Sequence, residues 1–444
     1  MRCRLGKWNY QRFLANNRIL KTLLVLLGAL YVLFAFLPKH ADYWTILNVS
    51  EAFAVDPVHF MVGQPWPTVP TVAYPPTFYA LQGTWLRLGS YLFHYDLSTN
   101  SNLFYSYGQT SFGLFPFWGM VPTLAALFIL VAIAYKRLNN KWLTLICFGP
   151  ITFIAVGVMG QIDVICALII FASLILVQQA LRAKKYFSLL LLGYLALGIS
   201  MEFKTYCGML LPAYAIYTLA LFKDRKISIS KSLVTLGSCL ALFLFAMFIV
   251  WAPYPGWFNT IILGGESSNY LLHVPPIFVF GLLIITSIVP TSTRSLSIWP
   301  IWLLGYSVIL CYMGTRVLGN PRKYVHDGRY FIFFIFTIIA WFFVAVFTHP
   351  QWWMFIIPAS LLMLDNFENK AGTNAFVCIL IAYSFYPMLF YEIPAVITSY
   401  HIPAAIFIDP AWGQVSSGLA DAVLAGLLTF WFFVSKRELD SMIS

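Results

Sequence analysis

Four ionisable side chains stand at the edges of long apolar segments, where each could take part in chemistry. Asp42 occurs in the sequence HADYW, directly after the first apolar segment, and Asp163 follows a Gly-Gln-Ile turn. Glu202 and Lys204 lie together between two further apolar segments. A carboxylate at such a position could accept a proton from a hydroxyl group, and a lysine could bind a phosphate. Because ionisable groups at membrane depth cost free energy, each is a candidate functional residue.

Each of these residues also has an ordinary structural explanation. Asp42 could be a solvated loop residue that caps the next helix, and Asp163 could be an N-cap or a first-turn carboxylate stabilised by its helix dipole. Glu202 and Lys204 could form an ion pair with each other or with a neighbouring helix. Both explanations of each residue therefore stay open from the sequence.

Aromatic and polar residues at the same edges widen the set of candidates. His349 and Gln351 occur in the sequence HPQWW between two aromatic-rich segments. His349 could donate a hydrogen bond to a phosphate or sugar oxygen, or it could belong to an aromatic belt with a proline-induced break. Tyr74 is one of several aromatic residues after the first apolar segment that could pack on a sugar ring or anchor the chain.

Sequence signatures of soluble enzymes are absent. The chain contains no P-loop, GxGxxG, HExxH or GxSxG motif, and no acidic triad of the DxD type. Six of the seven cysteines lie within apolar segments, without CxxC or other metal-type spacing. We therefore expect no metal and no cofactor, and a cytosolic nucleotide-sugar site has no support.

The composition is that of a polytopic membrane protein. Of the 444 residues, 60% are hydrophobic and only 10% are charged, against about 25% in soluble domains. Apolar runs recur along the chain, each near the roughly 20 residues that cross a bilayer as a helix. The fold class expected is therefore all-α, with about 12 transmembrane helices (11–13).

The net charge of +11 is explained by topology and not by nucleic-acid binding. Short loops rich in Lys and Arg lie in the cytoplasm, which places 23 of the 27 basic residues inside and leaves Lys39, Arg87, Lys204 and Arg294 outside. The expected spans are 19–38, 112–135, 142–158, 163–181, 186–201, 206–222, 232–252, one within 273–315, 330–348, 352–364, 374–391 and 416–434. The parity of the crossings makes 274–290 a re-entrant or interfacial segment.

The chain is expected to form one membrane domain, 19–434, between cytoplasmic ends at 1–18 and 435–444. Its most informative part is the external loop 39–111, which is too long for a simple connector. Within it, residues 77–93 suit a helix lying in the membrane interface, because their apolar surface is interrupted by Gln82, Arg87 and two glycines.

Several of these pieces together resemble the GT-C superfamily, and most closely its polyprenyl-phosphate-sugar-dependent mannosyl- and glucosyltransferases. The resemblance covers about residues 19–365. Its pieces are an Asp just after the first helix, a long first external loop closing with YPPT at 74–77, the GQIDV run at 160–164, a Lys before LLP at 210–212, and THPQW at 348–352 followed by IIP.

The resemblance implies transfer of a sugar from a polyprenyl or dolichyl phosphate to an acceptor hydroxyl on the external or lumenal face, with inversion and without a metal. Asp42 would be the general base. The donor phosphate would bind to Lys204, His349 and Arg87, and the sugar or the acceptor to Gln161, Asp163, Glu202, Tyr74 and Gln351. Some relatives carry His-Glu-Lys or His-Glu-Arg where this chain has His-Pro-Gln, so the phosphate charge is less fully compensated here.

Two other classes stay open as alternatives. A transporter or flippase for lipid-linked glycans would also be polytopic, but the long first loop and the lack of an inverted repeat count against it. An O-antigen polymerase or ligase would use lipid-linked sugars, but its large loop comes late in the chain. The partners expected are the lipid-linked donor, a glycan, glycolipid or lipid-linked acceptor, and membrane lipid. The location expected is a bacterial or archaeal plasma membrane, with the endoplasmic reticulum as the alternative.

Overall fold

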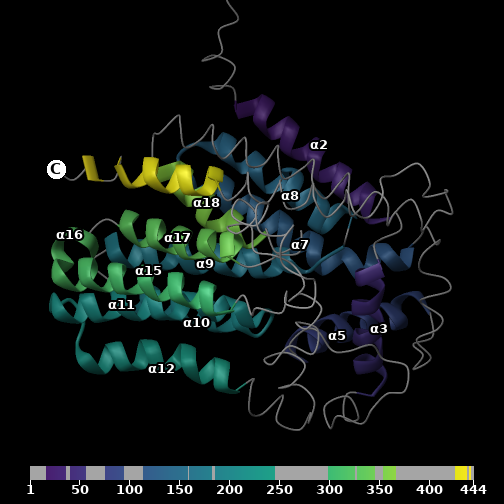
Figure 1. Ribbon diagram of the computed structural model, residues 1–444. Helices are drawn as coiled ribbons and strands as arrows, with labels where there is room; N and C mark the ends of the chain where they lie inside the picture. Colours follow the sequence, from purple (N-terminus) through teal and green to yellow (C-terminus); the bar gives the residue numbers. More distant parts are fainter. Residues whose placement is uncertain are drawn as a thin grey trace, which may run out of the picture.

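The computed structural model describes residues 17–36, 41–56, 76–94, 114–158, 160–182, 186–245, 299–325, 328–345, 354–366, 426–437 and 440–441 (Figure 1). Within these ranges the regular structure is helical, without a strand. Five of the helices are long and apolar enough to cross a membrane. The all-α membrane fold expected from the composition is therefore confirmed.

The bundle is built from helices that run side by side (Figure 1). Several begin and end within a few residues of the expected spans, because basic or glycine-containing turns interrupt the apolar runs. The bundle helices are α2 (Asn17–Ala35), α7 (Leu114–Arg137), α9 (Asp163–Arg182), α10 (Tyr186–Met201), α11 (Leu211–Lys223), α12 (Ile229–Phe245), α15 (Trp299–Gly319), α17 (Arg329–Ala345) and α18 (Ile356–Asn366). Helix α9 packs against both α7 and α10 and is largely buried.

The segment expected as one continuous span at 142–158 is broken into three pieces. They are the 3₁₀ helix η1 (Lys141–Phe148), the short helix α8 (Pro150–Thr152) and the π-helical turn η2 (Phe153–Val158). The first break is at Gly149, whose backbone is extended, and Pro150 follows without an N–H to continue the hydrogen-bond ladder. The residues expected to cross the membrane here are thus helical in pieces, and the break at this Gly-Pro pair was not part of the expectation.

Helix α18 is the described part of the span expected at 352–364. It has 11 residues, contains Pro358 and is buried along Ile356–Leu364. A helix this short is tolerated at membrane depth when protein surrounds it on all sides. The span expected at 416–434 is described only over 426–437, which are helical. The expected segments 274–290 and 374–391 lie outside the described residues.

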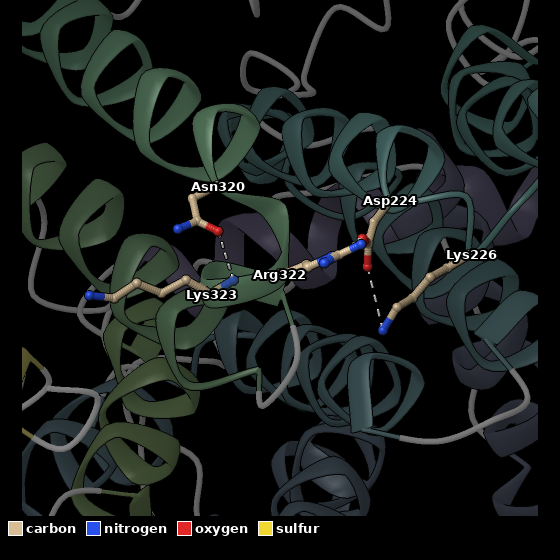
Figure 2. A network of polar contacts seen from close by, with 5 residues as sticks. All are labelled: Asp224, Lys226, Asn320, Arg322 and Lys323. Carbon is tan, nitrogen blue, oxygen red and sulfur yellow. Dashed lines mark hydrogen bonds and ion pairs between the residues drawn. The ribbon is translucent and has the colours of Figure 1, made fainter.

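One end of the bundle carries a network of polar contacts between two neighbouring turns (Figure 2). Asp224, after α11, lies 3.7 Å from Lys226 Nζ and 3.6 Å from Arg322 Nε of the short helix α16 (Pro321–Val325). Lys223 donates a hydrogen bond to the carbonyl of Leu318 at 2.7 Å. These contacts fasten the α11–α12 turn to the α15–α16 turn, and they gather basic residues at the end that the charge pattern assigned to the cytoplasm.

Two helices from the expected external loop lie at the opposite end of the bundle (Figure 1). They are α3 (Ala41–Val55), which runs across the ends of the bundle helices, and α5 (Pro76–Phe93), which packs on α3. The helix expected at 77–93 is thus confirmed. Asn48, which stands in an Asn-Val-Ser sequon, is only 2% exposed within α3, so the folded protein does not present it for glycosylation.

Helix α5 is joined to α7 by hydrogen bonds between side chains and backbone. Gln82 Nε2 donates to the carbonyl of Gly119 at 2.9 Å. Trp85 and Trp118 stack at 4.4 Å between ring centroids, and each indole N–H donates to the backbone carbonyl of the other residue. Elsewhere on its surface, α5 exposes apolar side chains such as Leu81, Leu88 and Leu92. One apolar face exposed and one face docked on protein suit a helix in the membrane interface.

We predict that Gly83→Ala lowers stability by about 1–3 kcal/mol, the usual cost of overpacking. A Cβ at position 83 on α5 would lie 2.5 Å from the carbonyl oxygen of Ser50 and 3.2 Å from the backbone nitrogen of Ala54, both on α3. Backbone atoms cannot move aside cheaply, so the two helices would separate. Thermal unfolding in detergent measures the effect.

The matched control is Gly237→Ala on α12, where nothing lies within 4 Å of an added Cβ. Alanine there is expected to leave the stability unchanged or to raise it by up to about 1 kcal/mol through helix propensity. Equal effects of the two substitutions would contradict close packing of α3 on α5.

Candidate active site

The start of α9 is shaped by a turn in which Gly160 is required. Its φ of +67° lies in the left-handed region, which side chains with a Cβ rarely adopt. A Cβ at this position would also lie 2.7 Å from the ring of Tyr43, on the first turn of α3. The turn continues through Gln161, whose N–H donates to the carbonyl of Ala155 at 2.7 Å and whose side chain is fully buried. Asp163 is then the first residue of α9.

A second turn joins α10 to the next helical segment and carries the other charged residues. The N–H of Glu202 donates to the carbonyl of Ile199, and that of Lys204 to the carbonyl of Ser200, which closes α10. Lys204 itself has an extended backbone, and the 3₁₀ helix η3 (Thr205–Leu210) begins directly after it. Glu202 and Lys204 are therefore held in a tight turn between two helical segments.

Asp163 and Lys204 form a buried ion pair between these two turns. Lys204 Nζ lies 3.2 Å from Oδ1 of Asp163, with side-chain exposures of 8% and 2%. The hydroxyl of Tyr206 donates to the same oxygen at 3.1 Å. Of the two structural explanations left open for Lys204, pairing with a neighbouring helix is the observed one. Asp163 is also a carboxylate in the first turn of α9, as one of its two structural explanations expected, and its side-chain partners there are Lys204 and Tyr206.

Glu202 makes a separate contact with α5. The hydroxyl of Thr77 donates to Oε2 of Glu202 at 3.1 Å, and the rings of Phe78 and Phe203 pack at 6.5 Å between centroids. Burial raises the pKa of Glu202 from 4.5 to about 7, because desolvation disfavours the carboxylate, and the Thr77 hydrogen bond lowers it only in part. Glu202 thus changes charge near neutral pH.

Each of the two carboxyl groups keeps one buried oxygen without a hydrogen-bond partner among the described residues. These atoms are Oδ2 of Asp163 and Oε1 of Glu202. A buried carboxylate oxygen without a donor carries a large desolvation cost, so such an atom needs an explanation. Hydroxyl groups of a bound ligand would supply the missing donors. No group of three His, Cys, Asp or Glu side chains suited to a metal ion occurs in the described part of the chain.

The backbone of Asp42 lies at the same end of the bundle. Asp42 is the second residue of α3, next to Tyr43, whose ring packs on Gly160 as described above. The first turn of α3 is therefore in contact with the turn that leads to Asp163. Residues that stand about 120 positions apart in the chain are thus brought to one place by the crosswise position of α3.

The other residues expected at the site are distributed differently. Arg87 is exposed on α5, ten residues beyond Thr77, which is about 15 Å along the helix axis. Its assignment to the donor phosphate stays a prediction. Tyr74, His349 and Gln351 lie outside the described residues, so their assignments stay predictions as well.

Tyr206 is a site residue that the sequence did not single out. Its ring stacks on Phe342 of α17 at 6.0 Å and meets Phe355 edge-on at 5.3 Å. Lys204 Nζ lies over the same ring, 5.7 Å from its centroid. In a chain with 25 tyrosines, the only sequence signal was its position two residues after Lys204.

We predict that Lys204→Met lowers the free energy of unfolding by about 3–5 kcal/mol, because Asp163 would keep a buried charge without its cation. Adding Asp163→Asn to this variant should recover most of the loss. Unfolding in detergent at neutral pH measures both effects. If Glu202→Gln rescued Lys204→Met instead of Asp163→Asn, the pairing seen in the structure would be wrong.

We also predict a pH dependence of stability that is caused by Glu202. Because its pKa is raised in the folded protein, the folded state binds more protons than the unfolded state between about pH 4.5 and 7. The free energy of unfolding attributable to this group therefore falls as the pH rises through that window and stays level above it. Glu202→Gln should remove this part of the slope, measured as the difference from wild type. Identical slopes for both proteins would contradict the raised pKa.

Comparison with known proteins finds one family whose description matches part of the chain. Residues 93–251 match the family described as dolichyl-phosphate-mannose-protein mannosyltransferase, a segment that includes Asp163, Glu202, Lys204 and Tyr206 but not Asp42. No curated protein matches the sequence at a significant level.

Two solved structures are similar over most of the chain. They are ArnT from Cupriavidus metallidurans bound to undecaprenyl phosphate and the same protein in its apo state, each with 12% identity and a TM-score of 0.47. The first alignment covers 95% of this chain and 78% of ArnT, and the second covers 94% and 76%. At this identity and TM-score, these two structures establish nothing about the ligand or the mechanism of the chain. The family match over residues 93–251 agrees with the resemblance to lipid-phosphate-dependent mannosyltransferases seen in the sequence.

Proposed function

We propose that the protein transfers a sugar from a polyprenyl or dolichyl phosphate to a hydroxyl group of an acceptor. The observation that carries this proposal is the buried Asp163–Lys204 ion pair beside Glu202, with two carboxylate oxygens that lack donors in the described part of the chain. A sugar linked to phosphate has the complementary groups, which are hydroxyls that donate hydrogen bonds and an anion that a lysine can bind.

Asp163 and Glu202 would hold the sugar or the acceptor. Their oxygens Oδ2 and Oε1 are buried and accept no hydrogen bond from a described residue, so a hydroxyl donor placed there removes a desolvation cost that the empty site bears. Gln161, fully buried in the adjacent turn, is proposed to act in the same group. Such a site would prefer ligands rich in hydroxyls to apolar ones.

Lys204 would stabilise the departing phosphate. In the donor, the phosphate linked to both sugar and lipid carries one negative charge. When the bond between the anomeric carbon and the phosphate oxygen breaks, the lipid phosphate that leaves carries two. A cation near this oxygen therefore interacts more strongly with the transition state than with the donor, which lowers the barrier. Lys204 supplies this cation without a metal.

Asp42 would act as the general base. The acceptor hydroxyl gives its proton to the Asp42 carboxylate as its oxygen forms a bond with the anomeric carbon, while the phosphate leaves from the other side. A single displacement of this kind inverts the configuration of the sugar. The proposal is supported by the contact between the first turn of α3 and the turn that leads to Asp163.

We place the reaction on the external or lumenal face of the membrane. Basic residues gather at the opposite end of the described bundle, around the contacts among Asp224, Lys226 and Arg322. Because loops rich in Lys and Arg stay in the cytoplasm, the end that carries Asp163 and Lys204 would face outward. A bacterial or archaeal plasma membrane is the location we propose, with the endoplasmic reticulum as the alternative.

The family name supports a lipid-linked mannose donor, although sugar and acceptor are part of the proposal. The proposal is tested with purified protein in detergent and a radiolabelled hexose on a polyprenyl phosphate. Incorporation into an acceptor is the result expected of a transferase. No incorporation in detergent, together with movement of the carrier between the leaflets of proteoliposomes, is the result expected of a flippase. Transfer from a pyrophosphate-linked donor only would favour a polymerase or ligase instead.

We predict that Asp42→Asn lowers turnover by about 10²–10⁴-fold, the usual effect of removing a general base. Asparagine keeps the shape and hydrogen bonding of aspartate but cannot accept the proton, so folding and donor binding should change little. The measurements are kcat with the radiolabelled donor and the dissociation constant for the same donor.

The matched control is Asp56→Asn, which removes a carboxylate just beyond the far end of α3. It should leave kcat near the wild-type value. Glu51 is a poor control, because it is only 3% exposed and its loss would disturb the packing of α3. Normal turnover in Asp42→Asn together with loss of turnover in Asp56→Asn would require another base.

A further inference from the structure

We propose that Tyr206 is a positioning residue that orients Asp163 toward the sugar and links the ion pair to α17 and α18. This inference rests on the proposed function, because it assigns Tyr206 a task in that reaction. Tyr206 acts through Asp163 and does not need to touch the donor or the acceptor. Three sets of contacts around its hydroxyl and its ring support the proposal.

The first set concerns the hydroxyl. Tyr206 and Lys204 both bind Oδ1 of Asp163, at 3.1 and 3.2 Å, whereas Oδ2 has no partner among the described residues. Two donors on one oxygen fix the rotation of the carboxylate, so that Oδ2 is the atom available to a ligand. Without the hydroxyl, Lys204 would be the remaining described partner, and the carboxylate could turn about its bond to Cβ.

The second set concerns the ring and Lys204. Lys204 Nζ lies over the Tyr206 ring at 5.7 Å from the centroid, within the distance at which a cation interacts with an aromatic face. Tyr206 therefore contacts both members of the ion pair, one through its hydroxyl and the other through its ring. Both contacts come from one side chain at the start of η3.

The third set fixes Tyr206 itself. Its ring packs between Phe342 of α17 and Phe355, just before α18. These two phenylalanines stand on either side, in the sequence, of the segment 346–353 that carries His349. The chain on both sides of that segment is thus anchored on the residue that orients Asp163. A change in the packing of α17 or α18 would be transmitted to the sugar-binding carboxylate through one ring.

The test measures the preference of the protein for a sugar on its carrier. We define this sugar preference as the dissociation constant for a polyprenyl phosphate without sugar, divided by that for the same carrier charged with the hexose that the wild type transfers. Tyr206→Phe keeps the ring and removes only the hydroxyl. We expect it to lower the sugar preference about tenfold, as for one hydrogen bond to a charged group. The constant for the sugar-free carrier should stay within about threefold.

A double-mutant cycle separates positioning from a merely structural effect. In an Asp163→Ala background, Tyr206→Phe should cause no further loss of sugar preference, because the group that it orients is gone. A full additional loss there would show that Tyr206 acts elsewhere and would overturn the proposal. An equal weakening of both carriers by Tyr206→Phe would show a structural role only and would overturn it too.

The matched control is Tyr214→Phe on α11. Tyr214 is also a buried tyrosine whose hydroxyl contacts a polar side chain, Ser173 Oγ at 2.8 Å, but it does not contact Asp163. Loss of the Tyr214 hydroxyl is expected to lower stability without changing the sugar preference.

If Tyr206→Phe fails to fold, Phe355→Leu replaces it, since that variant keeps the hydroxyl and removes one of the two rings that hold Tyr206. It should lower the sugar preference less than tenfold but measurably, and an unchanged preference would count against the proposal.

An error in the proposed function can be told apart from an error in the role of Tyr206, because the wild type itself then fails the test. If the wild type binds neither carrier and transfers no sugar, the proposed function is wrong. The link between Tyr206 and Asp163 is then decided by thermal unfolding, in which Tyr206→Phe should destabilise the wild type more than the Asp163→Ala variant. Equal destabilisation in both backgrounds would overturn the positioning role independently of any sugar.

Discussion

The arrangement of the site depends on one buried ion pair, between Asp163 at the start of α9 and Lys204 at the end of α10. Either charge alone would be costly where both side chains are almost fully enclosed. Each therefore requires the other, and together they fix how the ends of two packed helices meet. Lys204 and Tyr206 both contact Oδ1 of Asp163, so this ion pair also sets the direction of Oδ2 and the place of the Tyr206 hydroxyl.

Helices α3 and α5 add contacts to the site that the bundle helices alone do not make. Helix α3 contacts the Gly160 turn through Tyr43, and α5 contacts Glu202 through Thr77. The Asp163–Lys204 ion pair and the Glu202 carboxylate all come from turns at the end of the bundle. Helices α3 and α5 bring further side chains to that end, and burial of Glu202, which also contacts Thr77 of α5, raises its pKa to about 7. The proposed site therefore combines residues of the bundle turns with contacts from α3 and α5.

The sequence predicted the helices that charged turns delimit, and it singled out Asp163, Glu202 and Lys204, which the structure brings to one end of the bundle. Helix α10 begins and ends where the basic turn and the Glu-Phe-Lys turn indicate, and the helix at 77–93 was recognised from its interrupted apolar surface. The break at Gly149 was missed because apolar composition alone does not show a loss of helical hydrogen bonds. The partner of Lys204 and the contacts of Tyr206 could not be predicted, because they depend on how α9 and α17 pack and not on neighbours in the sequence.

The paired indoles of Trp85 and Trp118 have a consequence for the membrane around the protein. Tryptophans at a bilayer surface often anchor a segment through contacts with lipid headgroups. Here both indole N–H groups donate to carbonyls of the protein itself, and the rings stack on each other. The contact between α5 and α7 therefore uses both indole N–H groups within the protein, and we expect it not to depend on the headgroups of the surrounding bilayer.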